Sequence, residues 1–243
     1  MRPRVDILGV EFDRVALLSA TEEITQRLAA GRRTFVITAN PEFVMLCRRD
    51  PEVAAIAAAA DLVIPDGTGA LVASRLLGDP LPGRAPGRLL VERLAAVARE
   101  RDLSLYLLGA APGVADRAAA ALVARHPGLR IAGTHDGDAD SSAAVAEVAA
   151  ARPDLLFVAF GMPKQERWIA RHLDGLPTVK LAVGIGGSLD YLAGTAKPPP
   201  RLIHAIGLEW LWRLVRDPKR WRRQRVLPVF VVLVVLARLR RRR

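Results

Sequence analysis

Apolar and polar segments alternate along most of the chain. Up to about residue 187, short apolar runs rich in β-branched residues are separated by longer alanine-rich stretches. The apolar runs predict strands at Val5–Gly9, Thr34–Thr38, Asp61–Ile64, Leu103–Leu108, Leu129–Gly133, Asp154–Phe160 and Val179–Gly184. The stretches between them predict helices, among them Ala20–Ala30, Gly87–Arg101, Gly113–His126 and Ser142–Ala151. Several runs are apolar almost throughout, as in strands covered on both faces. We therefore predict an α/β fold with a Rossmann-like, mostly parallel sheet flanked by helices.

The pattern changes after Leu192. Lys197–Pro200 cannot continue a helix. Arg201–Arg216 and Lys219–Arg225 then predict two helices, with a proline at the first turn of the second. Val226–Ala237 is apolar throughout, and the last six residues include five arginines. We expect an α/β domain over residues 1–196 and a helical appendage over residues 197–243.

The charge distribution supports the same division into a domain and an appendage. The 243 residues carry a formal net charge of +11. Residues 197–243 hold 14 Lys and Arg against two acids, whereas residues 1–196 have a net charge of −1. Three of the four tryptophans also lie in the appendage. This asymmetry indicates a polyanionic partner, either a nucleic acid or an anionic membrane surface.

The apolar run Val226–Ala237 bears on the choice of partner. As a helix it would reach only ~18 Å at 1.5 Å per residue, too short to span a bilayer core of ~30 Å. It could dip into one leaflet with its arginines at the headgroups, or it could pack on the domain as a buried helix or strand. Anionic lipid also explains the flanking charge. An apolar run is a poor nucleic-acid surface, and no nucleic-acid-binding module is recognisable, so we expect no nucleic acid partner.

Candidate chemistry lies in the loops that follow the strands, because parallel sheets bind ligands beyond the carboxyl ends of their strands. Asn40 before Pro41 is typical of an N-cap, but Thr38 and Asn40 could also hydrogen-bond a sugar. Asp66 could cap the next helix or act as general base on a substrate hydroxyl. Both roles can hold at once.

Two later loops are rich in glycine. Gly161–Glu166 contains Gln165 and precedes a helix whose N–H groups could meet a phosphate. Gly184, Gly186 and Gly187 fall within four residues, a density that favours close approach of a ligand to the backbone, although tight turns also use glycine.

Other sites are disfavoured. Leu108–Gly113 lacks the G-x-G-x-x-G spacing, which argues against a nicotinamide-dependent oxidoreductase. Asp136–Asp140 matches the opening of an EF-hand, but Ser141 replaces the required glycine. The single cysteine, Cys47, excludes an intramolecular disulfide. We expect no metal and no cofactor.

Taken together, the loops resemble one family. TANPEFV (38–44), PDGTG (65–69), FGMPKQERWI (160–169), GIGGSLDYLAG (184–194), GLEWLWRL (207–214) and DPKRWRRQ (217–224) occur in the order of the WecG/TagA/CpsF glycosyltransferases. The resemblance implies transfer of an N-acetylmannosamine-type sugar from a UDP donor to GlcNAc linked to undecaprenyl diphosphate. It implies a role in teichoic acid or related surface polysaccharide synthesis, with the protein peripheral on the cytoplasmic face of the plasma membrane.

The resemblance also assigns roles to matching residues. It makes Asp66 the catalytic base, Thr38 and Asn40 a substrate-pocket pair, and Arg84 an arginine near the acceptor. It places Gln165 in an active-site segment. The appendage arginines that would hold the lipid diphosphate are Arg213, Arg220 and Arg223, a role that suits arginine forks. The reaction would be inverting and metal-independent, with helix N-termini and arginines offsetting the donor charge.

Because of two departures from the family pattern, the sequence does not decide which sugar is transferred or to which acceptor. The usual R-V-x-G-x-D stretch here runs from Arg84 to Leu89, with leucine in place of aspartate, and Pro198–Pro200 replaces the usual R-A-P. Transfer of another UDP-hexose or of a uronic acid therefore remains an alternative. A homo-oligomer also remains open, because the appendage could cover either its own active site or a neighbour's.

Overall fold

A computed structural model describes residues 4–198, 200, 203, 209–216, 218 and 221–241. Its elements are, in chain order, β1 (Arg4–Ile7), β2 (Val10–Asp13), α1 (Leu17–Ala29), β3 (Thr34–Ala39), α2 (Pro41–Cys47), α3 (Pro51–Ala59), β4 (Leu62–Pro65), α4 (Thr68–Leu77), α5 (Gly87–Glu100), β5 (Ser104–Gly109), α6 (Val114–Arg125), β6 (Arg130–His135), α7 (Ser142–Ala151), β7 (Leu155–Ala159), α8 (Lys164–His172), the 3₁₀ turn η1 (Leu173–Gly175), β8 (Leu181–Gly184), α9 (Ser188–Leu192), α11 (Glu209–Arg216), α12 (Trp221–Gln224) and α13 (Leu227–Arg240).

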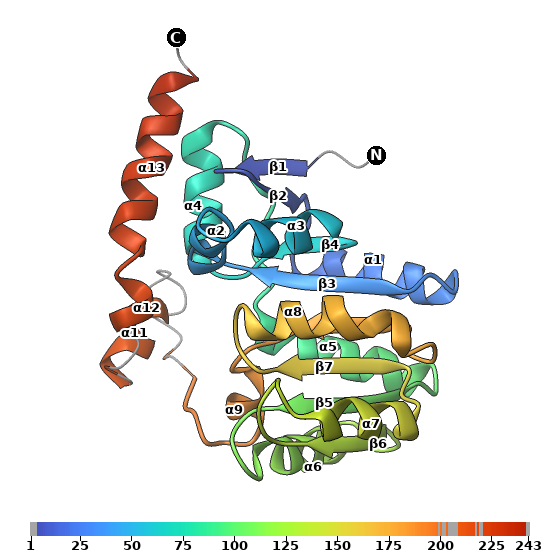
Figure 1. Cartoon of the computed structure of the whole chain (residues 1–243). Coiled ribbons are helices and arrows are strands. Elements are labelled where there is room, and N and C mark those ends of the chain that lie inside the picture. The colour runs from blue at the N-terminus through green and yellow to red at the C-terminus, as the bar shows by residue number, and fades with distance from the viewer. Residues whose placement is uncertain are drawn as a thin grey trace.

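Six strands form a parallel sheet in the order β4-β3-β8-β7-β5-β6. Alternate residues along a strand enter separate hydrophobic clusters: along β5, Leu105 and Leu107 belong to one cluster, Tyr106 and Leu108 to the other. Helices α1, α5, α6 and α9 cover one face of the sheet, and α2, α3, α7 and α8 cover the other (Figure 1). The predicted α/β fold with a parallel sheet is confirmed.

The N-terminal strand differs from the prediction. The run Val5–Gly9 does not join the main sheet; its strand, β1, pairs antiparallel with β2 in a separate hairpin. Leu8 and Gly9, with φ of 55° and 93°, form the turn, as a two-residue hairpin of the type I′ kind requires. The prediction was therefore wrong in the strand's partner and missed β2 entirely.

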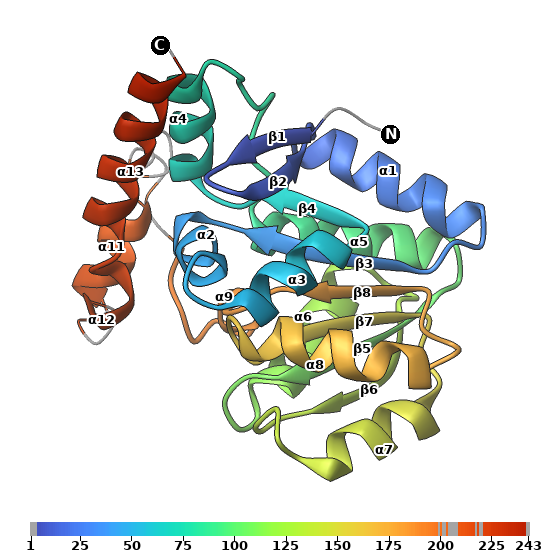
Figure 2. The same cartoon turned by 45° about the horizontal axis from the view of Figure 1, so that its top comes forward.

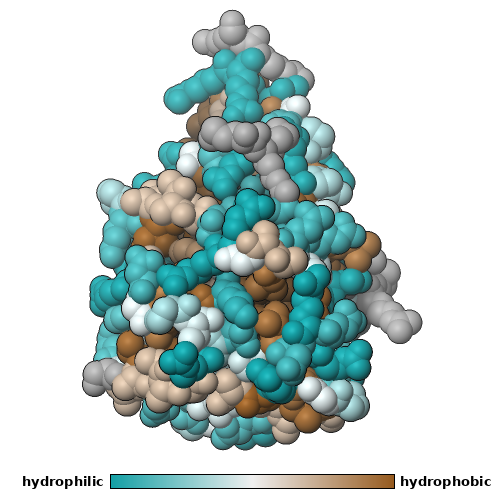
Figure 3. Space-filling model, turned by 90° about the vertical axis from the view of Figure 1, so that its right-hand side faces the viewer, coloured by the Kyte–Doolittle hydropathy of each residue, from teal (hydrophilic) through white to brown (hydrophobic). Residues whose placement is uncertain are grey.

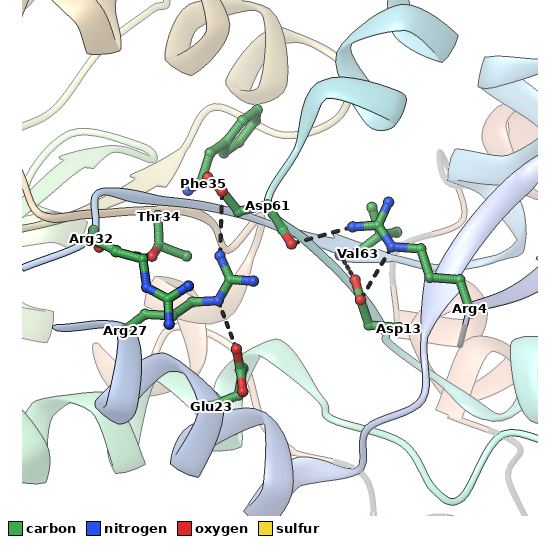
Figure 4. A network of polar contacts seen from close by, with 9 residues as sticks. All are labelled: Arg4, Asp13, Glu23, Arg27, Arg32, Thr34, Phe35, Asp61 and Val63. Carbon is green, nitrogen blue, oxygen red and sulfur yellow. Dashed lines mark hydrogen bonds and ion pairs between the residues drawn. The ribbon is translucent and has the colours of Figure 1, made fainter. Parts of the chain in front are cut away.

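A buried carboxylate fastens this hairpin to the main sheet (Figure 4). Asp13 accepts hydrogen bonds from the backbone N–H of Val63 at 2.8 Å and from Nε of Arg4 at 3.2 Å. Beside it, Arg27 pairs with Glu23 at 2.7 Å and with Asp61 at 3.3 Å, which ties α1 to the start of β4. These contacts explain why a strand that ends in an acid is stable in the interior.

The C-terminal helix α13 runs alongside α4 (Figure 2). Val226, Phe230 and Val234 are buried in the same hydrophobic cluster as residues of α2 and α4. The exposed apolar residues of α13 are Val229, Val231, Val232, Val235, Leu236 and Leu239, whereas Leu233 and Ala237 are partly buried against the same cluster. One side of the run therefore packs on the α/β domain, and the other faces outward. Among the described residues, no helix has the length and apolar character needed to cross a bilayer.

The two predicted helices that precede α13 are found in part. Glu209–Arg216 of the first is the helix α11, and Trp221–Gln224 of the second is the helix α12. Residues 201, 202, 204–208, 217, 219 and 220 lie outside the described residues.

Candidate active site at the carboxyl edge of the sheet

The predicted site residues converge because their strands are neighbours. Ala39 of β3 pairs with Pro65 of β4, and Gly184 of β8 pairs with Ile37 of β3 and with Val158 of β7. The helices after β3 and β7 cover one face of the sheet, whereas the helix after β8 covers the other. Such a reversal at adjacent strand ends is where open α/β sheets bind ligands.

The appendage lies on this same side of the molecule. The strands β3 and β7 point toward α11, α12 and α13 (Figure 1). The opposite side, where the strands begin, is covered mostly by hydrophilic residues, with apolar side chains in small separate groups (Figure 3). A surface hollow on that side is lined by both apolar and charged residues, the charged ones including Arg33, Asp61 and Asp174. It contains none of the predicted site residues.

Thr38 and Asn40 at the end of β3 both have structural bonds. The Thr38 hydroxyl is buried and donates to the carbonyl oxygen of Gly184 at 2.8 Å, which joins β3 to β8. Oδ1 of Asn40 accepts from the N–H of Phe43 at 3.0 Å and caps α2, with Pro41 in the first turn. The predicted cap is confirmed, and Asn40 remains partly exposed at the sheet edge.

Asp66 lies one strand away, partly exposed. Its backbone N–H donates to the carbonyl oxygen of Ala39 at 2.7 Å, which holds the two loops together. The N-cap residue of α4 is Gly67 and not Asp66. The first turns of α2 and α4 also touch, because a Cβ on Gly69 would lie 2.5 Å from Cγ of Pro41. Close packing at a glycine thus sets Asp66 beside Asn40.

Arg84 connects this pocket to the appendage. Its Nη1 donates to Oγ1 of Thr68 at 3.2 Å and to Oε1 of Glu209 at 2.9 Å. Thr68 is the first residue of α4, and Glu209 is the first residue of α11. The guanidinium group therefore lies at the start of α4 and already binds a carboxylate, which shows that it can hold an anion here.

The buried Gln165 side chain packs against Gly184, the last residue of β8. It is 1% exposed, and a Cβ on Gly184 would lie 2.6 Å from its Nε2. Its Oε1 accepts from the N–H of Gly186 at 2.9 Å, and its Nε2 donates to Oε1 of Glu166 at 2.8 Å. Gly187 follows as the residue before α9. In this structure Gln165 therefore holds the glycine loop in place, and both ends of its amide are bound within the protein.

Comparison with known proteins decides the class of this site. The sequence model of the Glycosyl transferase WecG/TagA/CpsF family matches residues 5–243. The chain belongs to this family. An N-acetylglucosaminyldiphosphoundecaprenol N-acetyl-beta-D-mannosaminyltransferase of Staphylococcus aureus strain MRSA252 is 34% identical over 238 residues, which are 97% of this chain and 93% of the relative. A protein of the same name from strain MW2 is 33% identical over the same shares of both chains. The chain is a glycosyltransferase.

The structure of this glycosyltransferase adds a residue that the sequence did not single out. Glu166 has no exposed surface, and its Oε2 has no hydrogen-bond partner among the described residues. Burial raises the pKa of its carboxyl group to about 7, against the weaker lowering effects of the Gln165 hydrogen bond and the Arg223 charge. A glutamate in the first turn of a helix ordinarily faces solvent, so the sequence carried no signal of this burial.

Of the three appendage arginines in the WecG/TagA/CpsF pattern, only Arg223 has a side chain among the described residues. Nε of Arg223 on α12 lies 3.2 Å from Oε2 of Glu42, in the first turn of α2. Arg213 lies in α11, but its side chain is outside the described part, as is the whole of Arg220. The Arg223–Glu42 ion pair therefore joins the appendage to the first turn of α2, and the Arg84–Glu209 ion pair joins it to the loop before α5.

No metal site is evident in the described part of this glycosyltransferase. None of its His, Cys, Asp and Glu residues form a group of three or more that could hold an ion. The acidic segment Asp136–Asp140 is instead engaged locally. Asp136 accepts from the N–H of Gly113 at 2.7 Å, and Asp138 pairs with Lys164 at 2.8 Å.

Proposed function

We propose that this glycosyltransferase transfers N-acetylmannosamine from a UDP donor to GlcNAc carried on undecaprenyl diphosphate. The observation that carries the proposal is the 34% identity to an enzyme of that name over 97% of this chain. Thr38, Asn40 and Asp66 support it, because they lie together at the carboxyl edge of the sheet, where a sugar and a diphosphate can meet polar side chains and backbone N–H groups. The product would enter teichoic acid or related surface polysaccharide synthesis.

Asp66 acts as general base in the proposed reaction. Its carboxylate takes the proton from the acceptor 4-hydroxyl, and the freed oxygen forms a bond to the anomeric carbon of the donor sugar. The bond from that carbon to UDP breaks on the opposite face, and UDP leaves with the electron pair, so the anomeric configuration inverts. The partial exposure of Asp66 in the loop between β4 and α4 is consistent with direct contact with substrate.

No metal takes part in the proposed mechanism. Arginines offset the charge of the two diphosphates instead, since guanidinium groups bind phosphate oxygens through paired hydrogen bonds. The Arg84 guanidinium group lies beside Thr68 at the start of α4, where it would exchange its present partner, Glu209, for a phosphate. The Arg223 side chain reaches from α12 to Glu42 in the first turn of α2 and would make the same exchange.

We propose that the outer side of α13 contacts the inner face of an anionic membrane. It presents six exposed apolar residues, and arginines follow at its end. Because α13 lies on the side where β3 and β7 end, docking there would bring the site toward a lipid-linked acceptor (Figure 1). Each basic residue near such a surface contributes about 1 kcal/mol, so several give reversible attachment.

Flotation with liposomes that contain anionic lipid tests this docking. The double variant Val232→Glu, Val235→Glu changes the exposed side of α13 and spares its buried side. Val123→Glu on α6 is a matched control, since Val123 is also exposed but lies in a different helix. We expect the parent and the control to float and the double variant to stay in solution. A double variant that floats as well as the parent would exclude the proposed surface.

The donor is tested with a panel of UDP-sugars and a polyprenyl-diphosphate-GlcNAc acceptor, read by mass spectrometry. We expect UDP-N-acetylmannosamine to give the fastest addition of one N-acetylhexosamine. Faster addition of an uronic acid or of a plain hexose would overturn the proposed sugar and leave the lipid-linked acceptor standing. A product from UDP-N-acetylmannosamine with free GlcNAc but none with the lipid-linked form would overturn the acceptor.

A further inference from the structure

A buried polar chain connects the glycine loop of the site to the interior. The N–H of Gly186 donates to Oε1 of Gln165 at 2.9 Å, and Nε2 of Gln165 donates to Oε1 of Glu166 at 2.8 Å. Gln165 and Glu166 are 1% and 0% exposed. Amide orientation is thereby fixed from both ends: the carboxylate accepts from the amide nitrogen, which leaves the amide oxygen to face the Gly186 N–H.

The carboxyl group of Glu166 lies in an unfavourable place for any purely structural role. Burying a carboxyl group is destabilising unless its oxygens find partners. Its Oε2 has none among the described residues, whereas Oε1 is bound to Gln165. The hydrogen bond to Gln165 is thus the main contact by which this side chain acts on its surroundings, and it leads to the site.

The titratable groups near Glu166 do not compete for its hydrogen bond with Gln165. Arg223 on α12 exerts a weak attractive effect, but its guanidinium group is paired with Glu42. The Cys47 thiol of α2 is also near, and burial, together with the Glu166 charge, raises the pKa of this thiol to about 12. Cys47 therefore keeps its proton, and its S–H group donates to the carbonyl oxygen of Val53 at 3.9 Å instead of to the carboxyl group.

We propose that Glu166 is a positioning residue for the transfer reaction: its buried carboxyl group orients the Gln165 amide, which in turn fixes the glycine loop Gly184–Gly187 at the sheet edge. The proposal rests on the proposed location of the active site at that edge. Gly184 has no room for a Cβ beside Gln165, so the loop and the amide fit together in one arrangement. Loss of the carboxyl group frees the amide to turn and the loop to move.

Three variants test this role. Glu166→Met keeps the approximate size and removes the acceptor, whereas Glu166→Gln keeps an oxygen that can accept from Gln165. Glu23→Met is a matched control, because Glu23 is also a buried glutamate but lies on α1. We expect Glu166→Met to lower kcat/KM by up to about 100-fold, Glu166→Gln to restore much of that loss, and Glu23→Met to retain the parent value. Equal kcat/KM for Glu166→Met and the parent would overturn the proposal.

A double-variant cycle separates positioning from a direct role. If Glu166 acts through Gln165, Glu166→Met should have little further effect once Gln165→Met is present. If the double variant instead lowers kcat/KM by the product of the two single effects, the proposed action of Glu166 through Gln165 is overturned. Should Glu166→Met fail to fold, Glu166→Asp gives the same comparison, since its shorter side chain withdraws from Gln165; parent activity would then overturn the proposal.

Hydrogen exchange supplies a readout that needs no substrate. The Gly186 amide should exchange more than about tenfold faster in Glu166→Met than in the parent, with unchanged exchange in β5. Unchanged exchange at Gly186 would overturn the inference, whatever the sugar specificity. Conversely, faster exchange together with an Asp66→Asn variant as active as the parent would refute the proposed base and leave the positioning role intact.

Discussion

The buried carboxyl group of Glu166 should make the stability of the protein fall as the pH rises. Its pKa is raised by burial from 4.5, the value for an exposed group, to about 7 in the folded chain. Between these values the folded state holds a proton that the unfolded state has lost, so the free energy of unfolding decreases with increasing pH. The stabilisation is fully present below about pH 4.5 and is lost as the pH passes 7. At 1.36 kcal/mol per pH unit, the whole window amounts to about 3 kcal/mol.

Urea unfolding followed by tryptophan fluorescence at several pH values between 5 and 8 measures this slope. Other groups also titrate in that range, so the quantity to compare is the difference between the parent and Glu166→Gln, which cannot ionise. We expect the parent to lose most of the ~3 kcal/mol relative to the variant over this range. Glu23→Gln serves as control, because Glu23 is buried but paired with Arg27. Parallel curves for the parent and Glu166→Gln would refute the burial argument.

Three further substitutions test the packing around the site. Phe230→Ala should lower the free energy of unfolding by about 3–5 kcal/mol or release α13 to proteolysis, because Phe230 is buried between α13 and the domain. Asp13→Asn should lower it by about 1–3 kcal/mol, since Arg4 and Val63 donate to different carboxylate oxygens and asparagine has an NH2 donor in place of one of them. Gly184→Ala should reduce kcat/KM by about tenfold or more, as its Cβ displaces Gln165.

Two of these substitutions have a control in the same chain. Val232→Ala on the exposed side of α13 should change the unfolding free energy by less than about 0.5 kcal/mol, and a similar value for Phe230→Ala would mean that α13 is not docked. Asp13→Asn with the stability of the parent would show that the hairpin is held by other contacts. Gly175→Ala meets no neighbour and should retain activity; equal activity for Gly184→Ala would contradict the close fit to Gln165.

Hydrophobic periodicity predicted the main sheet because all of its strands except β6 are buried on both faces and largely apolar. It missed β2, whose sequence Val-Glu-Phe-Asp ends in an acid. That acid is buried against Arg4 and Val63, contacts that lie far apart in the sequence and leave no local signal. It also left α13 undecided, since a run that is apolar at every position shows no preferred face.

The residues of the candidate site that directly follow strand ends could be predicted from the sequence. Asn40 and Asp66 follow adjacent strands, and the sequence already placed them at the carboxyl edge. The role of Gln165 was not predictable, because its burial depends on Gly184 in a strand that follows later in the chain. Glu166 lies near Cys47 of α2 and within reach of the Arg223 charge on α12, and no spacing in the sequence encodes that these elements meet.

The most direct test of the account is the rate of sugar transfer by Asp66→Asn to a polyprenyl-diphosphate-GlcNAc acceptor. With the donor that the parent uses fastest, at saturating concentrations of both substrates, general-base catalysis predicts a rate about 10²–10⁴-fold below that of the parent. The thermal unfolding midpoint should stay close to that of the parent, because Asp66 is partly exposed and asparagine has nearly the same size and shape. A folded Asp66→Asn protein that transfers the sugar as fast as the parent would contradict the assignment of the catalytic base.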